Sequence, residues 1–221
     1  MIVLAVDTAL GACQAVLLAG DGAPVVRSVV MDRGHQERLA PLVAELFEEA
    51  GLRPSGVERI GVTVGPGSFT GLRVGLAFAK GFGLGIGAPP VGIGTLQALA
   101  LGAQGRVASV ISAPHDRCYL QLFDGALALS RPDLLSWKEA ADLCRAGGVV
   151  EAIGPGAADL AERLPALAVD SRLAPDPARL AAHLATLAAP FAPAAPLYLR
   201  EPDAKTIAER AALKALAATA P

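Results

Sequence analysis

The chain has 221 residues, and its 19 basic and 21 acidic side chains leave a net charge of −2. A free-standing nucleic-acid-binding protein usually carries a strongly basic face, so this balance argues against tight RNA binding by the chain alone. Hydrophobic residues make up 53% of the sequence and aromatic residues only 4%. We therefore expect a core built mainly from Ala, Leu, Val and Ile.

Nothing in the pattern of apolar residues predicts a membrane protein. The longest apolar region, residues 74–103, is interrupted by a lysine, prolines and several glycines, which argues against a membrane span. The N-terminus begins directly with a strand pattern and not with an export signal. The three cysteines, Cys13, Cys118 and Cys144, are far apart, which is typical of reduced, buried thiols. We expect a cytoplasmic protein.

The first half of the chain predicts a three-strand meander followed by a helix, a strand and a helix. Short apolar runs indicate strands, and an apolar period of 3.6 residues indicates helices. In chain order the expected elements are strands at 2–6, 12–18 and 25–30, a helix that ends before Gly51, a strand at 60–64, a helix opened by Ser68, a strand at 90–93 and a helix opened by Thr95.

The second half of the chain partly repeats this pattern. A β-β-β-α-β-α unit is expected twice, which predicts an N-terminal domain of residues 1–103 and a C-terminal domain of residues 104–221. The expected elements are strands at 107–111, 118–123 and 126–129, a helix at 137–146, a strand at 149–153 followed by a Gly-Pro-Gly turn and a helix, a further helix at 176–189, a Pro-rich link at 190–196 and a helical tail at 204–218.

The most informative string is the glycine-rich turn and helix start from Gly65 to Gly75. Ser68 is placed to cap the helix, and backbone N–H groups at the helix start are suited to an anion. The string matches neither a P-loop nor the Gly-x-Gly-x-x-Gly dinucleotide loop. The residues expected at a weak nucleotide- or anion-binding site are Asp7, Thr8, Gly65, Gly67 and Ser68.

Small residues recur every four positions along the helix after this turn. Gly71, Gly75, Ala79 and Gly83 therefore share one face of the helix, where another backbone can come close. One interpretation is close packing inside one domain, and the other is contact with a helix of another subunit. On the second interpretation the partner interface consists of Gly71, Arg73, Gly75, Ala79, Gly83 and His35.

Several strings together resemble the bacterial TsaB family, also called YeaZ. This family has the duplicated β-β-β-α-β-α fold of the actin and sugar-kinase superfamily, which is ribonuclease H-like. The matching strings are Leu4-Ala5-Val6-Asp7-Thr8-Ala9, the run from Gly65 to Gly75, Gly92-Ile93-Gly94-Thr95-Leu96 and Pro196-Leu197-Tyr198-Leu199-Arg200. Where many relatives have Asp-Ala-Arg at the first turn of the second domain, this chain has Ser112-Ala113-Pro114.

The resemblance implies a role in making threonylcarbamoyladenosine beside the anticodon of tRNA. It implies a non-catalytic subunit without a cofactor, which forms a heterodimer with the larger catalytic paralogue TsaD and works with the ATPase TsaE. Contact with tRNA would then be indirect, and the chain on its own would be able to form a homodimer.

The alternative is an autonomous enzyme of the same fold, either an ATP-dependent kinase or transferase or a metallopeptidase. The catalytic paralogue holds its metal through His-x-x-x-His, and Thr95 and Leu99 occupy those positions here, so we expect no metal site. Ser68 lacks the glycine that a nucleophile elbow needs at position 70. Asp7 either holds metal and phosphate, as in the kinases, or accepts turn N–H groups.

Overall fold

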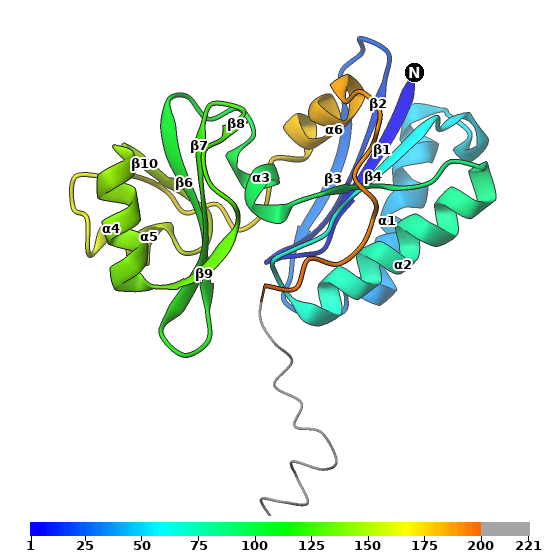
Figure 1. Cartoon of the computed structure of the whole chain (residues 1–221). Helices are drawn as coiled ribbons and strands as arrows, with labels where there is room; N and C mark the ends of the chain where they lie inside the picture. Colours follow the sequence, from blue (N-terminus) through cyan, green and yellow to red (C-terminus); the bar gives the residue numbers. More distant parts are fainter. Residues whose placement is uncertain (200–221) are drawn as a thin grey trace, which may run out of the picture.

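The computed structural model describes residues 1–199, in which two sheets stand side by side (Figure 1). The first sheet has the strand order β3-β2-β1-β4-β5, with β1 antiparallel to β2 and parallel to β4. Helices α1 and α2 cover one face of it. The elements are β1 (Ile2–Asp7), β2 (Ala12–Ala19), β3 (Val25–Val30), α1 (His35–Ala50), the short 3₁₀ helix η1 (Pro54–Gly56), β4 (Arg59–Thr63), α2 (Phe69–Ile86) and β5 (Val91–Ile93).

The second sheet repeats this order as β8-β7-β6-β10-β11, with β9 also paired to β7. The duplication expected from the sequence is thus confirmed, and the mixed α/β fold is of the actin-like type. Two short strands, β9 and β11, were not expected. The elements are β6 (Arg106–Ala113), β7 (Arg117–Asp124), β8 (Leu127–Ala128), β9 (Asp133–Ser136), α4 (Trp137–Gly147), β10 (Glu151–Ile153), α5 (Ala157–Ala161) and β11 (Ala168–Asp170).

The two units exchange a helix. Helix α3 (Thr95–Ala100) follows the first sheet but packs on the second, where Leu96 and Leu99 join a buried cluster with Phe123. Helix α6 (Pro177–Thr186) follows the second sheet but packs on the free face of the first. Division into residues 1–103 and 104–221 is therefore wrong, because the apolar faces of these helices are buried by the other unit.

After α6 the chain returns along the edge of the first sheet (Figure 1). We call residues 190–199 the strap. Gly92 N–H donates to Ala192 O at 2.9 Å, and Leu197 N–H donates to Val64 O at 2.7 Å. The strap therefore belongs to the first unit, although the sequence placed it in the second. The helical tail expected at 204–218 lies outside the described residues.

Local signals account for several helix ends. Gly51, in the left-handed conformation, ends α1 as expected, and Ser136 forms a reciprocal capping box with Glu139 at the start of α4. All three cysteines are buried free thiols. Within residues 1–199, every helix is too short or too polar to cross a membrane.

Candidate functional site

The turn after β1 is held by a fully buried carboxylate. Asp7 Oδ1 accepts hydrogen bonds from Ala9 N–H at 3.1 Å and from the Thr63 hydroxyl at 2.5 Å. Its other oxygen, Oδ2, accepts one from the Gln14 amide at 3.2 Å. Burial raises the pKa of the Asp7 carboxyl, and the hydrogen bonds from Thr63, Ala9 and Gln14 oppose that rise. Of the two interpretations of Asp7, the turn interpretation is the one these contacts support.

Helix α2 lies directly against this turn. The Thr8 hydroxyl donates to Gly71 O at 2.7 Å. A Cβ added at Gly71 would overlap Thr8 O, and one added at Gly75 would lie only 2.6 Å from Thr8 Oγ1. The small residues therefore allow a backbone of the same unit to come close.

The prediction that the small residues face a partner subunit is wrong. Gly71, Gly75 and Gly83 are buried, as is Ala79 at 0% exposure. At Gly83 a Cβ would overlap Ala88 O, in the turn that follows the helix. The ridge predicted from the four-residue spacing exists, but it faces the sheet and turns of its own unit.

The prediction that His35 belongs to a partner interface is also wrong. It opens α1 but is only 6% exposed, so it is not a surface residue. Its Nε2 has no hydrogen-bond partner within residues 1–199. Arg73 is the one member of the expected interface that is exposed, because it lies on the outer face of α2, away from the small residues.

The glycine-rich turn uses several of its polar groups internally. Ser68 caps α2 as expected, since its Oγ accepts Gly71 N–H at 3.2 Å. Ser68 N–H donates to Ala9 O at 2.7 Å, and Gly65 N–H donates to the Thr95 hydroxyl at 3.1 Å. Thr95 thus fastens the turn. Anion binding at Gly65, Gly67 and Ser68 stays a prediction, and the donors of Gly65 and Ser68 are already engaged.

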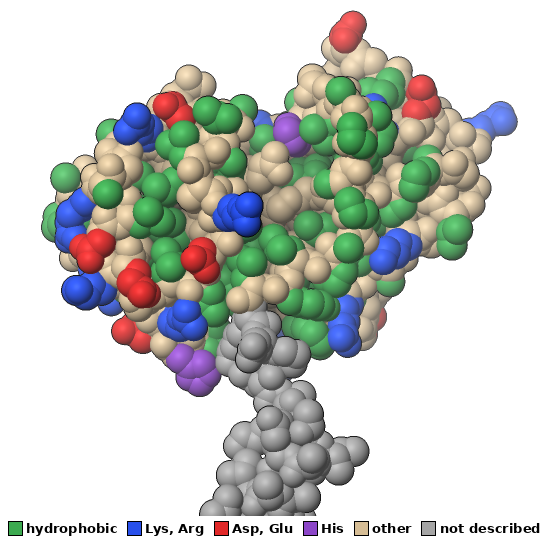
Figure 2. All heavy atoms as spheres, viewed as in Figure 1, with side chains coloured by type: hydrophobic (Ala, Val, Ile, Leu, Met, Phe, Trp, Pro, Cys, Tyr) green, Lys and Arg blue, Asp and Glu red, His purple; other side chains and the backbone are tan. Residues whose placement is uncertain are grey.

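A cleft of about 1270 Å³ separates the two units. Most of its lining is apolar, and hydrophobic side chains gather along the junction of the units (Figure 2). Asp7 and Thr8 are not among the lining residues. Those residues are Ala9, Leu10, Asp32, Pro66, Gly67, Ser68, Phe69, Leu72, Arg73, Ile111, Ser112, Pro114, Tyr119, Leu197, Tyr198 and Leu199.

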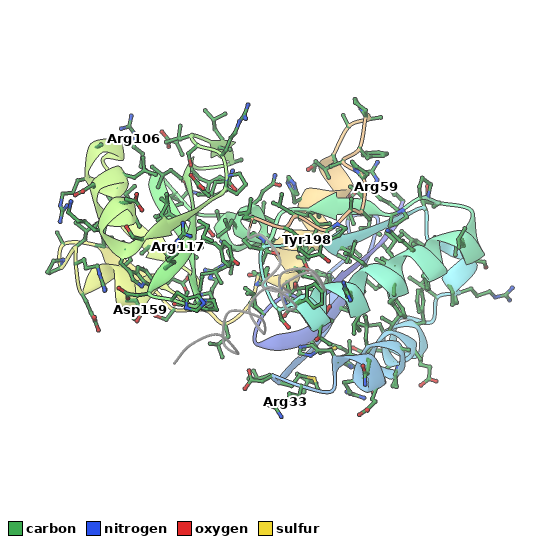
Figure 3. The ribbon with its side chains drawn as sticks, turned by 60° about the horizontal axis from the view of Figure 1, so that its bottom comes forward. Arg33, Arg59, Arg106, Arg117, Asp159 and Tyr198 are labelled. Carbon is green, nitrogen blue, oxygen red and sulfur yellow. The ribbon has the colours of Figure 1, made fainter. Side chains whose placement is uncertain are left out.

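The second unit contributes the altered turn at Ser112-Ala113-Pro114 to this cleft. Ser112 Oγ donates to Asp159 Oδ2 at 2.7 Å, at the start of α5. Asp159 and Arg117 lie on the same side of the second unit (Figure 3). The Ser112 hydroxyl is therefore bonded within its own unit.

A second hollow, of about 500 Å³, lies between the outer faces of α1 and α2. We call it the α1–α2 groove. Phe69 and Arg73 line both this groove and the cleft. The remaining lining residues are Gln36, Leu39, Ala40, Thr70, Val74, Ala77 and Phe78.

The α1–α2 groove was missed at the level of sequence, although Phe69 and Arg73 stand in the most informative string. A hydrophobic residue on the polar side of an amphipathic helix is the signal that could have found it. Phe69 is 56% exposed and Leu84 is 86% exposed, both on the outer face of α2. Tyr198 is 50% exposed. It stands in the string at 196–200, for which the sequence predicts no role.

Two solved structures from Pseudomonas aeruginosa share this architecture. They are YeaZ, with a TM-score of 0.74 and 26% identity, and a protein with similarity to peptidase YeaZ, with a TM-score of 0.79 and 28% identity. Each alignment covers 90% of this chain and 99% of the other. The duplicated sheets and the cleft between them define an actin-like α/β protein.

Sequence comparisons narrow this class to one family. The Escherichia coli tRNA threonylcarbamoyladenosine biosynthesis protein TsaB is 37% identical over 103 residues, which are 47% of this chain and 44% of that protein. An uncharacterized protein of Mycobacterium tuberculosis is 34% identical over 208 residues, 93% of this chain and 95% of the relative. The chain belongs to the TsaB (YeaZ) family.

The matches differ in how much of each relative they cover. An uncharacterized protein of Mycobacterium leprae is 32% identical over 216 residues, but these are 56% of its length. The alignments thus span about half of the M. leprae and E. coli relatives. A family model described as TsaD, tRNA N6-adenosine threonylcarbamoyltransferase, matches residues 28–129.

Proposed function

We propose that this chain is a non-catalytic subunit of a tRNA-modifying complex. It pairs with the catalytic paralogue TsaD, joined by the ATPase TsaE, and so supports threonylcarbamoyl transfer to the adenosine beside the anticodon. The names of the TsaB relatives support the pathway. The match of residues 28–129 to the TsaD model supports common descent with the transferase.

The proposed pairing rests on the exposed apolar side chains of the outer face of α2. Phe69, which lines the α1–α2 groove, is 56% exposed, and Leu84, near the other end of the helix, is 86% exposed. Large exposed apolar side chains on a helix face are candidates for contact with another protein. The expected partner surface thus moves from the buried side of α2 to its exposed side, and Arg73 remains in it. When TsaD is absent, the same surface is suited to a second copy of this chain.

The alternative of an autonomous enzyme has less support. A kinase of this fold would need the carboxylate of Asp7 to reach metal or phosphate in the cleft. That carboxylate is buried, and both of its oxygens accept hydrogen bonds from its own unit. We expect a reconstituted tRNA modification assay to fail when TsaD is omitted. Turnover without TsaD that is abolished by Asp7→Ala would favour the enzyme.

Mixing the purified chain with TsaD of the same organism tests the pairing directly. Size-exclusion chromatography should show a new, larger species, and Leu84→Glu should abolish it by placing a charge in the interface. Leu127→Glu is the matched control, because Leu127 is 66% exposed but lies on the second unit. The proposal is wrong if the wild-type chain forms no complex with TsaD.

A further inference from the structure

The strap brings a distant part of the chain to the start of α2. It is fastened by the Gly92–Ala192 and Val64–Leu197 backbone hydrogen bonds, and Pro193 forms a bridge with Val91. Tyr198, the residue after Leu197, lies where the two units meet (Figure 3). The strap therefore fixes the position of Tyr198 relative to α2.

Tyr198, Phe69 and Arg73 form one contact series, which we call the Arg–Phe–Tyr cluster. The ring centroids of Tyr198 and Phe69 are 5.9 Å apart, with the ring planes at 36°. The guanidinium carbon of Arg73 lies 3.8 Å from the Phe69 centroid. A tilted aromatic pair and a guanidinium over one of its rings attract one another and so restrain each other. The cluster is thus preorganised, although both of its rings are half exposed.

Within residues 1–199, no acidic side chain forms a salt bridge with Arg73. Its guanidinium instead contacts the Phe69 ring. A guanidinium held in one orientation and still exposed is suited to a carboxylate of a partner. Exposed aromatic rings next to arginine are also the residue types that carry most of the binding energy in protein interfaces.

We infer that the partner surface extends from the α1–α2 groove onto the strap, and that the Arg–Phe–Tyr cluster is its anchor. The occupant is a segment of the protein partner that presents an aromatic or aliphatic side chain next to a carboxylate. The apolar side chain packs against Phe69 and Tyr198, and the carboxylate pairs with Arg73. This inference rests on the proposed pairing with TsaD and adds a recognition element from the C-terminal part of the chain.

The first test removes the ring from the strap. In the full-length chain, Tyr198→Ala should weaken the dissociation constant for TsaD by about tenfold or more, as truncation of an interface anchor does. Tyr198→Phe should bind like the wild type, because it keeps the ring. Isothermal titration calorimetry measures both, and thermal melting of each free variant checks its fold.

The strap provides a matched control. Phe191 is 40% exposed, and Arg59 lies over its ring at 4.5 Å, which is the same pair of groups at the other end of the strap. Phe191→Ala therefore removes an equivalent ring from the same segment, at its contact with Arg59 and outside the Arg–Phe–Tyr cluster. It should leave the dissociation constant for TsaD within about twofold of the wild type, because surface changes outside an interface have little effect.

The second test concerns the charge of Arg73. Affinity for TsaD should fall as salt is raised, because exposed charge pairs are screened. Arg73→Gln should both weaken pairing and reduce this salt dependence. Arg73→Lys should keep the salt dependence but bind more weakly than the wild type, because an ammonium group has no flat face to lay over Phe69 and cannot form a bidentate pair.

The outcomes separate the inference from the proposed function. If the wild-type chain does not bind TsaD, the proposed function fails and the inference fails with it. If the wild type binds but Tyr198→Ala binds equally well, or no worse than Phe191→Ala, the proposed function stands and the inference is wrong. A Tyr198→Ala variant that pairs normally but gives a complex with weaker tRNA binding would assign the cluster to nucleic acid and also overturn the inference.

Discussion

Two glycines of α2 offer a sharp test of how this helix packs. Gly71 faces Thr8, and an added Cβ would overlap Thr8 O, an atom of the backbone. Gly81 lies ten residues further along the same helix, is exposed, and has no atom within 4 Å of an added Cβ. The same substitution, glycine to alanine, should therefore have opposite effects at these two positions.

Three contributions determine how much Gly71→Ala changes the free energy of unfolding. Forced repacking costs about 1–3 kcal/mol, and loss of the buried hydrogen bond from Thr8 Oγ1 to Gly71 O costs about 1 kcal/mol. The better helix propensity of alanine offsets about 1 kcal/mol. Gly71→Ala should thus lower the free energy of unfolding by about 2 kcal/mol, whereas Gly81→Ala should raise it by about 0.5–1 kcal/mol.

Thermal and urea unfolding of the chain alone measure both changes. For a protein of this size 1 kcal/mol corresponds to about 2–4 °C, so Gly71→Ala should lower Tm by about 4–8 °C. Gly81→Ala should raise Tm by about 1–4 °C. If Gly71→Ala were as stable as the wild type, α2 would not approach the Thr8 backbone so closely, and the reasoning would be refuted.

Two further predictions concern the buried side of α2 and the turn after β1. Ala79→Glu places an unpaired charge at a position of 0% exposure and should remove several kcal/mol, about half or more of a typical domain's stability. Ala77 is exposed in the α1–α2 groove. Ala77→Glu should therefore have the same urea midpoint of unfolding as the wild type, but it should fail to pull down TsaD. Equal stability of Ala79→Glu and Ala77→Glu would contradict the burial of this face. Burial raises the pKa of Asp7 in the folded chain, so the folded state favours the protonated carboxyl. This preference contributes fully to the free energy of unfolding below about pH 4, and the contribution is lost as the pH rises through the raised pKa. The stability of Asp7→Asn relative to the wild type should therefore improve from about pH 4 to pH 7, and a trend in the other direction would mean that the hydrogen bonds outweigh burial.

The order of the elements could be predicted from the sequence because its signals are local. Apolar periodicity, glycine at helix ends and the serine cap act within a few residues of each other. The strand at 25–30 and the helix that ends before Gly51 are therefore found as expected. The duplicated unit and the family could likewise be recognised from strings that stand in order along the chain. The short strands β9 and β11 carry too few residues for such a signal.

Only the tertiary structure decided which part of the molecule packs against each face of a helix. The spacing of Gly71, Gly75, Ala79 and Gly83 determines that they share a face, but a strand of the same unit and a helix of another subunit accept small residues equally well. Packing against Thr8 settles the choice. The burial of His35, by contrast, has no local signal.

The same limit explains the exchanged helices and the strap. Helices α3 and α6 have apolar faces that the sequence reveals, yet the sheet that buries each face belongs to the other unit. Tyr198 meets Phe69 across 129 positions of sequence. Contacts between residues so far apart depend on how the whole chain packs, because no pattern within a few residues encodes them. The sequence therefore determined the elements and the family, and only the packing determined which surface is free for a partner.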